Sequence, residues 1–152
     1  MKPLIKICGV ADGDNLIKLI NIEKINFLGF IFYKQSPRNA TKDFINSISN
    51  LDFKNKRAVC VYVNADREFI EETSSYFANP ILQFHGDETN AFCKSFKKDF
   101  WKVIRVKDAE SIKLITDYPD ASGILFENYE TGIYGGTCLL YTSPSPRDDG
   151  VS

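Results

Sequence analysis

Several residue types and patterns that mark common functional classes are scarce or absent in this sequence. It contains a single histidine, His85, which argues against a metal site built from several histidines. Its four cysteines, Cys8, Cys60, Cys93 and Cys138, form no CxxC pair and no zinc-finger spacing, which indicates reduced thiols and a cytoplasmic chain. No apolar run approaches the roughly 20 residues of a membrane span, and the first residues lack the apolar core of a signal peptide.

The sequence also lacks an excess of charge of either sign. Lysine and arginine number 19 against 20 aspartates and glutamates, which leaves a net charge of −1. This balance argues against a nucleic acid or an anionic membrane as a partner, so attraction for a phosphate group would have to come from a local site. With 152 residues, 43% of them hydrophobic, the chain is large enough for one globular domain with a substantial core.

Short β-like runs alternate with amphipathic helical stretches along most of the chain. The runs expected to form strands are residues 4–8, 27–32, 57–63, 80–84, 101–106 and 123–127. Thr41, Asp66, Thr89 and Asp108 stand where helix N-caps are expected. This alternation implies a parallel α/β sheet with right-handed crossovers. Two architectures remain open: a doubly wound open sheet, which suits the short chain, and a (β/α)8 barrel, which needs two more βα units.

The composition changes abruptly after Thr137. Residues 138–152 have no helical or strand period, which indicates a disordered tail. The eleven residues from Cys138 to Asp148 also match an in-frame translation of the transposase-end adapter used in short-read DNA libraries. We therefore interpret residues 1–137 as a partial domain and residues 138–152 as a non-native tail, to be left out of reasoning about the fold. The short length then no longer favours the open sheet.

Recognisable motifs stand at the ends of the expected strands. They are Lys6-Ile7-Cys8-Gly9, Gly29-Phe30-Ile31-Phe32 followed by Ser36-Pro37-Arg38, Val61-Tyr62-Val63-Asn64, Gln83-Phe84-His85-Gly86-Asp87-Glu88, Leu125-Phe126-Glu127 and Gly135-Gly136-Thr137. In this order and spacing the chain resembles the phosphoribosylanthranilate isomerase family, which are TIM-barrel enzymes of tryptophan biosynthesis, and the resemblance covers residues 4–137. It implies an α/β fold, a (β/α)8 TIM barrel that is incomplete here, with about five βα units plus a sixth strand.

The resemblance implies an Amadori rearrangement, in which N-(5-phosphoribosyl)anthranilate, an aminoaldose, becomes a 1-deoxyribulose ketose. The family's reaction needs no cofactor and no metal. A general acid protonates the ring oxygen of the sugar, and a general base removes the C2 proton. In a barrel both groups stand at the carboxyl ends of strands. The implied partner is this small phosphosugar, and the full-length protein is implied to be a monomer or a homodimer.

Two residues match the family's base and acid. Cys8 matches the general base, and a thiol titrates close enough to neutral pH to exchange a proton in a suitable site. Glu127 stands where the family places its general acid, which is normally an aspartate. Glutamate is longer by one methylene, and a displacement of about 1 Å can cost on the order of a hundredfold in rate, so this departure bears on the activity.

Three further residues are expected to contact the substrate. Arg38 matches the family's arginine in the loop after the second strand, whose guanidinium suits the anthranilate carboxylate. Gln83 and His85 lie two residues apart on one expected strand and therefore share a face. Their neighbours Leu82 and Phe84 are apolar and are expected to face the helices, which turns Gln83 and His85 into the barrel.

A barrel that stops near Thr137 would lack the phosphate-binding loops after strands seven and eight, and its first and sixth strands would be unpaired. We therefore expect the chain as written to be inactive and poorly soluble. The main alternative is a flavodoxin-like open-sheet binding domain without catalytic activity, which would need an acidic cluster or a phosphate loop after the first strand. Another phosphosugar barrel enzyme would need metal-binding histidines or a lysine and glutamate pair, and the single His85 and the Cys8 motif disfavour it.

Overall fold

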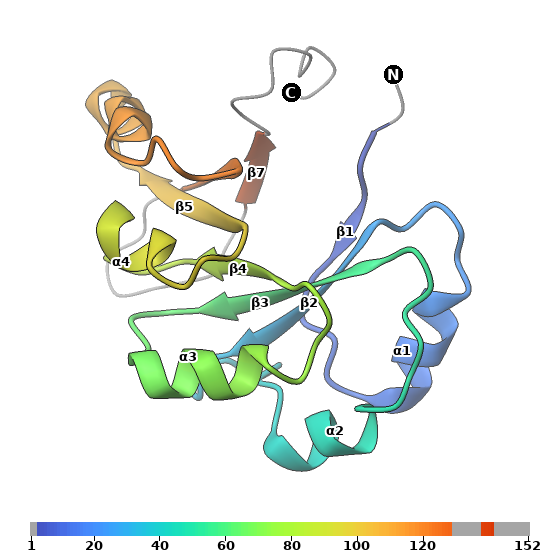
Figure 1. Ribbon diagram of the computed structural model, residues 1–152. Helices are drawn as coiled ribbons and strands as arrows, with labels where there is room; N and C mark the ends of the chain where they lie inside the picture. Colours follow the sequence, from blue (N-terminus) through green and yellow to red (C-terminus); the bar gives the residue numbers. More distant parts are fainter. Residues whose placement is uncertain (1–2, 129–137, 142–152) are drawn as a thin grey trace.

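The computed structural model describes residues 3–128 and 138–141 and contains one seven-stranded sheet. The strands are β1 (Lys6–Ile7), β2 (Phe27–Phe32), β3 (Arg57–Tyr62), β4 (Ile81–Phe84), β5 (Phe100–Val106), β6 (Gly123–Asn128) and β7 (Cys138–Tyr141). The helices are α1 (Gly13–Ile20), α2 (Lys42–Ser47), α3 (Arg67–Ser74), α4 (Asn90–Lys94) and the 3₁₀ helix η1 (Ala109–Asp117). Figure 1 shows a curved, open sheet with the helices along its outer side.

The strand order decides between the two architectures. It runs β1-β2-β3-β4-β5-β6 in sequence order, and every neighbouring pair up to β6 is parallel. A doubly wound sheet reverses its strand order at a switch point, which places helices on both faces. A sheet wound in one direction curves toward a (β/α)8 barrel instead. The structure is therefore an incomplete barrel, and the flavodoxin-like open sheet is wrong.

The helices begin at the expected capping residues. The side chains of Thr41, Asp66, Thr89 and Asp108 each accept a hydrogen bond from the backbone N–H three residues later. These bonds satisfy donors that the first helical turn leaves without a partner. The last of these elements, η1, winds as a 3₁₀ helix, and Ser111 completes a capping box with Asp108.

Both faces of the sheet are buried, but against different partners. Alternate residues of the strands, among them Leu28, Phe30, Cys60, Leu82, Phe84 and Ile124, pack under the helices. The intervening residues form a smaller cluster inside the half-barrel, made of Val59, Val61, Ile81, Trp101, Val103 and Leu125. This two-sided burial explains the nearly continuous apolar runs in the sequence. It also confirms that Leu82 and Phe84 face the helices.

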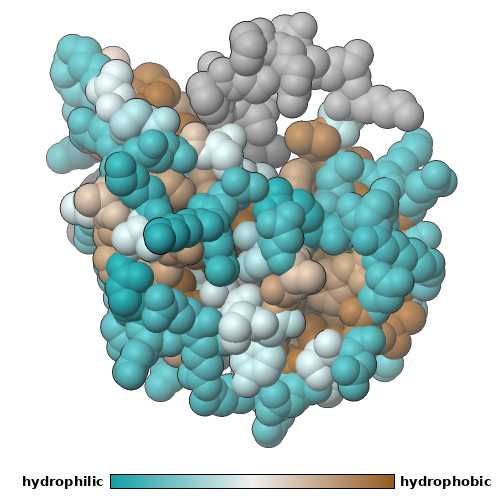
Figure 2. Space-filling model, viewed as in Figure 1, coloured by the Kyte–Doolittle hydropathy of each residue, from teal (hydrophilic) through white to brown (hydrophobic). Residues whose placement is uncertain are grey.

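The helices carry the polar surface. Figure 2 shows hydrophilic residues over much of the face in view, with hydrophobic residues visible between them in its lower right part. Among residues 3–128 and 138–141, none of the helices has the length and apolar character needed to cross a bilayer.

The segment after residue 137 differs from the sequence expectation. We expected no regular element in residues 138–152 and an unpaired sixth strand, whereas Cys138–Tyr141 form β7, antiparallel to β6. The N–H and C=O groups along the edge of β6 can pair with any extended segment, which accounts for this hairpin. A seventh barrel strand would be parallel to β6, so β7 does not continue the winding. The Gly135-Gly136-Thr137 motif lies outside the described residues.

Candidate active site

A cavity of about 620 Å³ opens at the carboxyl ends of the strands, on the inner side of the half-barrel. All five residues that the sequence marked for chemistry line it: Cys8, Arg38, Gln83, His85 and Glu127. They come from β4, β6, the end of β1 and the loop after β2, so only the parallel alignment of the strands brings them together. The sequence expectation that Gln83 and His85 face into the barrel is therefore confirmed.

The carboxylate of Glu127 is the most deeply buried polar group of the cavity. The residue is 2% exposed, and its Oε1 lies 2.8 Å from Nε2 of His85, within hydrogen-bond distance. Its Oε2 lies 3.9 Å from Nε of Arg105, which pairs with Glu127 in the β5–β6 register. A buried carboxylate needs such partners, because burial without them is costly. Glu127 is thus a fixed part of the site.

Sequence reasoning missed Arg105. It follows Trp101 and Val103 at alternate positions of β5, and those two residues belong to the inner cluster. The period of two along a strand places Arg105 on the same inner face. Once the face of Trp101 was assigned, this spacing was the signal that could have found Arg105.

Lys6 and Gln83 hold each other in place across the half-barrel. Lys6 Nζ donates a hydrogen bond of 2.6 Å to Oε1 of Gln83, and the ammonium lies 5.9 Å from the ring centroid of Trp101. Gln83 is therefore the hydrogen-bond partner of Lys6 inside the half-barrel. Because the amide oxygen of Gln83 accepts from Lys6, its NH₂ group is directed to other acceptors. The Lys6 bond therefore orients the amide.

Gly29 makes room for the inward side chains of β1. A Cβ atom at Gly29 would lie 3.2 Å from Sγ of Cys8 and 3.1 Å from Cε of Lys6. These separations are tighter than ordinary van der Waals contact, so a larger residue would displace the thiol. Packing against Cys8 and Lys6 thus explains why a glycine stands at the start of the Gly29-Phe30-Ile31-Phe32 motif.

Arg38 bridges the loop after β2 and the end of β1. Its Nη1 donates a hydrogen bond of 3.3 Å to the carbonyl oxygen of Cys8, and its guanidinium lies over Gly9. Gly9 has a φ of +80°, a backbone conformation that side chains rarely adopt. Arg38 is exposed, so its free N–H groups face the open side of the cavity.

We expect Gly9→Ala to disturb Arg38 more than it disturbs the fold. The new Cβ would lie 2.7 Å from Nη1 of Arg38, and the exposed side chain would swing away from it. Strain at a positive φ adds a cost of about 1 kcal/mol. Titration with an aromatic carboxylate should show weaker binding, while urea denaturation should show only this small loss of stability. Unchanged affinity would contradict the placement of Arg38.

The thiols of the described residues fall into two groups. Cys8 is half-buried and lines the cavity, whereas Cys60 and Cys93 are fully buried. Burial raises the pKa of Cys60 to about 12 and that of Cys93 to about 12, because desolvation disfavours the thiolate. Cys60 and Cys93 are therefore packing residues.

This contrast predicts selective alkylation. Alkylation requires the thiolate form of a cysteine. The pKa values of Cys60 and Cys93 lie far above 8, so at pH 8 their thiolate fractions are on the order of 10⁻⁴. Iodoacetamide should therefore label Cys8 in the folded protein and leave Cys60 and Cys93 unlabelled, as read by peptide mass spectrometry. Unfolding in urea should expose all three. Comparable labelling of Cys8 and Cys93 in the folded state would refute this assignment.

A second charged group supports the loops around the cavity. Glu88 is buried, and its Oε1 lies 3.4 Å from Nζ of the buried Lys102. The same carboxylate accepts hydrogen bonds from the backbone N–H groups of Gly86, at 2.9 Å, and Asn64, at 2.8 Å. The hydroxyl of Tyr118 donates to the carbonyl of Glu88 at 2.6 Å. Glu88 therefore ties the loops after β3 and β4 to β5 and to the end of η1.

These features define the class of the protein. A singly wound parallel sheet with polar side chains gathered at the carboxyl ends of its strands is the arrangement of (β/α)8-barrel proteins. Within the described ranges, no group of three or more His, Cys, Asp or Glu side chains is placed to hold a metal ion.

Comparison with known proteins places the chain within that class. It belongs to the N-(5'-phosphoribosyl)anthranilate (PRA) isomerase family, whose family model matches residues 5–137. It is 35% identical over 138 residues to the PRA isomerase of Nitrosomonas europaea, covering 90% of this chain and 65% of that protein. It is 35% identical over 133 residues to the enzyme of Pseudomonas fluorescens, covering 87% and 65%. The chain thus spans just under two thirds of the length of these relatives.

Solved structures agree with this assignment. PRA isomerase from Thermotoga maritima is 25% identical and superimposes with a TM-score of 0.74 over 88% of this chain and 65% of that one. A PRA isomerase in complex with reduced 1-(o-carboxyphenylamino)-1-deoxyribulose 5-phosphate is 25% identical, with a TM-score of 0.71 over 84% of this chain and 66% of that one.

Proposed function

We propose that this chain carries the acid and base of a PRA isomerase and acts on N-(5-phosphoribosyl)anthranilate. The observation that carries the proposal is the gathering of Cys8, Arg38, Gln83, His85 and Glu127 around one cavity. The named activity of the relatives and the reduced product-like compound bound by one solved relative support the same substrate class.

The reaction divides between two side chains. Glu127 donates a proton to the ring oxygen of the furanose, and the nitrogen lone pair opens the ring to an imine. Cys8 then removes the C2 proton, and the electrons of the C–H bond form the enolamine. Tautomerisation of the enolamine gives the 1-deoxyribulose ketone. The product is an isomer of the substrate, so the step needs no oxidant and no second substrate.

The remaining residues bind and orient. Arg38 is exposed at the rim and suits the anthranilate carboxylate, because a guanidinium can bind both oxygens at once. Gln83, oriented by Lys6, offers its NH₂ group to the sugar. His85 holds Glu127 by their 2.8 Å contact and also borders the substrate cavity.

The experiment that tests this proposal supplies the part of the barrel that the relatives have and this chain does not span. Residues 1–137 are joined to the last third of the Nitrosomonas europaea isomerase, which gives a protein called here the completed barrel. Turnover is followed by the loss of substrate fluorescence. We expect activity in the completed barrel and its loss in Cys8→Ala, while Cys93→Ala, which removes a packing thiol, stays active. A folded but inactive completed barrel would contradict the proposal.

The cellular compartment, the oligomeric state and the partners of the protein belong to the same proposal. We propose a cytoplasmic enzyme, monomeric or homodimeric at full length, with no nucleic-acid or membrane partner. The net charge of −1 supports the last point. A solved relative that is 27% identical consists of monomers generated from the dimeric isomerase of Thermotoga maritima, which supports either oligomeric state. We further propose that residues 1–137 are the domain and residues 138–152 a non-native tail. Long-read sequencing of the source DNA tests this.

A further inference from the structure

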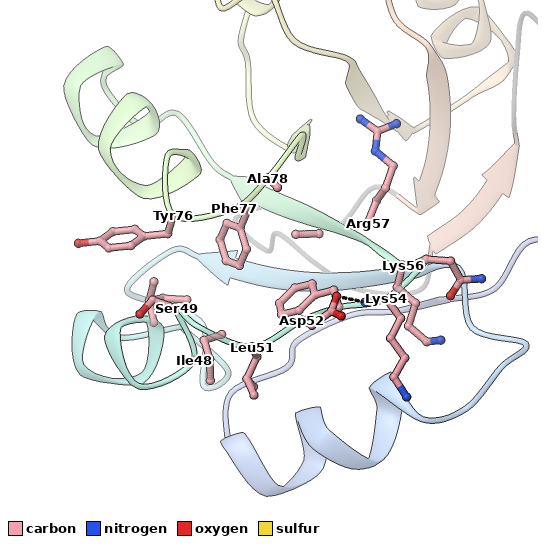
Figure 3. Close-up of a pocket in the computed structure, with 14 residues that line it drawn as sticks. Ile48, Ser49, Leu51, Asp52, Lys54, Lys56, Arg57, Tyr76, Phe77 and Ala78 are labelled. Atoms are coloured by element: carbon pink, nitrogen blue, oxygen red, sulfur yellow. Dashed lines mark hydrogen bonds between the residues drawn. The ribbon is translucent and has the colours of Figure 1, made fainter.

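Two lysines are buried in the part of the chain that the structure describes, Lys56 and Lys102. Lys56 precedes β3 and lines a cavity of about 470 Å³ between the end of α2, the loop into β3 and the residues after α3. Figure 3 shows Lys54 and Lys56 in that loop, and no residue with a proposed catalytic role lines this cavity. Lys102 lies on β5, is 3% exposed, and reaches with its ammonium the loop after β4, at the candidate active site.

Lys102 interrupts an apolar face of the sheet. Phe100 and Ile104 stand two positions away on either side, and both pack under the helices in the larger core cluster. The period of two along a strand places Lys102 on the same face. Lysine is almost never fully buried unless it is paired, because an ammonium loses its hydration there. A lysine in this layer therefore depends on specific partners.

The ammonium of Lys102 is held from several sides. Its Nζ donates a hydrogen bond to the carbonyl oxygen of Gly86 and lies 3.4 Å from Oε1 of Glu88. It also lies 5.3 Å from the ring centroid of Tyr118, within the range of a cation–π contact. Apolar residues in place of a buried ion pair often give equal or higher stability, so stability alone does not explain the pair.

The pair fixes the peptide groups on both sides of Gly86. The N–H of Gly86 donates to Oε1 of Glu88 at 2.9 Å, and its carbonyl accepts from Lys102. A Cβ atom at Gly86 would lie 2.5 Å from Oδ1 of Asn64, so the loop after β3 packs directly against this position. The backbone that follows β4 is thus fixed in place and in direction.

His85 is the residue just before this fixed point. Its N–H donates to the carbonyl of Tyr62 at 2.8 Å, and its own carbonyl belongs to the peptide group that Glu88 holds. The backbone of His85 is therefore held on both sides. Its Nε2 lies 2.8 Å from Oε1 of Glu127, so the direction of the imidazole sets where that carboxyl group stands.

We propose that Lys102 is a positioning residue for the acid of the candidate active site. Together with Glu88 it fixes the peptide groups of Gly86. These fix His85, and His85 holds the carboxyl group of Glu127. The role rests on the proposed isomerase function, because that function makes Glu127 the acid. The coupling between Lys102 and His85 is testable without turnover.

The first test is nitrogen NMR of the imidazole in the 152-residue chain. His85 is the single histidine of the sequence, so ¹⁵N-labelled histidine reports on this ring alone. We expect Lys102→Met to move both ring nitrogen shifts toward the averaged values of a solvent-exposed histidine at the same pH, because the ring loses its fixed contact with Glu127.

Ile104→Ala is the matched control for loss of stability. Ile104 is 2% exposed on the same strand and the same face, so its truncation weakens the core beside Lys102. It should leave the nitrogen shifts of His85 unchanged. Parental shifts in Lys102→Met, or equal changes in the two variants, would overturn the proposal.

A double variant guards against loss of folding. Lys102→Met alone leaves Glu88 buried without its counter-charge, whereas Glu88→Met combined with Lys102→Met leaves no charge buried. The double variant also frees Gly86, so it should change the His85 shifts in the same direction. Thermal unfolding checks that it is folded. A folded double variant with the parental His85 spectrum would count against the coupling.

The second test is steady-state kinetics in the completed barrel. Lys102→Met should lower kcat by about tenfold to a hundredfold, because a misplacement of about 1 Å can cost on the order of a hundredfold. KM should change little, and Ile104→Ala should keep the parental kcat where it is folded. An active parent with an equally fast Lys102→Met variant would overturn the positioning role. An inactive parent would contradict the proposed function, and the NMR comparison then decides the coupling to His85 by itself.

Discussion

Glu127→Gln should lower kcat of the completed barrel by about 10²- to 10⁴-fold, the usual contribution of a general acid. The amide has the same shape as the carboxylic acid and can keep its place 2.8 Å from His85, but it cannot protonate the ring oxygen. KM should change little, because binding relies on Arg38 and Gln83. Steady-state kinetics at fixed pH measures both constants. A Glu127→Gln enzyme as fast as its parent would remove Glu127 from the mechanism.

Glu127→Asp is the matched variant for the same position. It restores the residue that the family normally has, at the cost of the contact with His85, because the side chain is shorter by one methylene. We expect it to remain active, since the carboxylic acid is retained. If it were as slow as Glu127→Gln, the position of the carboxyl group would matter more than its chemistry, and His85 would be essential to that position.

Glu88→Gln should destabilise the protein by about 3–5 kcal/mol, the cost of breaking a buried ion pair from one side. Lys102 would be left buried without a counter-charge, and the new NH₂ group would face the backbone N–H of Gly86 or Asn64, two donors toward each other. Urea denaturation followed by circular dichroism measures the loss.

The control for this variant is Glu110→Gln. Glu110 pairs with Lys113 at 3.0 Å, but both side chains are more than 70% exposed, at 74% and 73%. Exposed pairs contribute little, so we expect a change below about 0.5 kcal/mol. Equal effects at Glu88 and Glu110 would show that burial of the Glu88–Lys102 pair is not what stabilises the loops.

Much of the fold followed from local patterns in the sequence. Short, nearly continuous apolar runs located the strands to within a few residues. Thr41, Asp66, Thr89 and Asp108 marked helix starts, because capping is a contact between near neighbours in the chain. The inward direction of Gln83 and His85 followed from the period of two in a strand.

The contacts that shape the site were harder to predict. The Lys6–Gln83 bond spans 77 positions and the His85–Glu127 contact 42. Pairs at such separations depend on the register between strands, and no pattern within one strand encodes that register. The hairpin of β7 was missed because its pairing depends on an available edge rather than on its own sequence. The inward direction of Arg105 could have been found from its spacing to Trp101 and Val103, but its pairing with Glu127 depends on the register with the neighbouring strand.

The loops at the mouth of the half-barrel are held in place by contacts of different strength. The loops after β3 and β4 share one carboxylate and a buried lysine, so they open only together and at a substantial free-energy cost. The contact of Arg38 with β1 is a single 3.3 Å bond from an exposed side chain. We therefore expect the loop after β2, which carries Arg38, to open at a lower free-energy cost than the loops after β3 and β4. Hydrogen exchange of the backbone amides in these loops measures that difference.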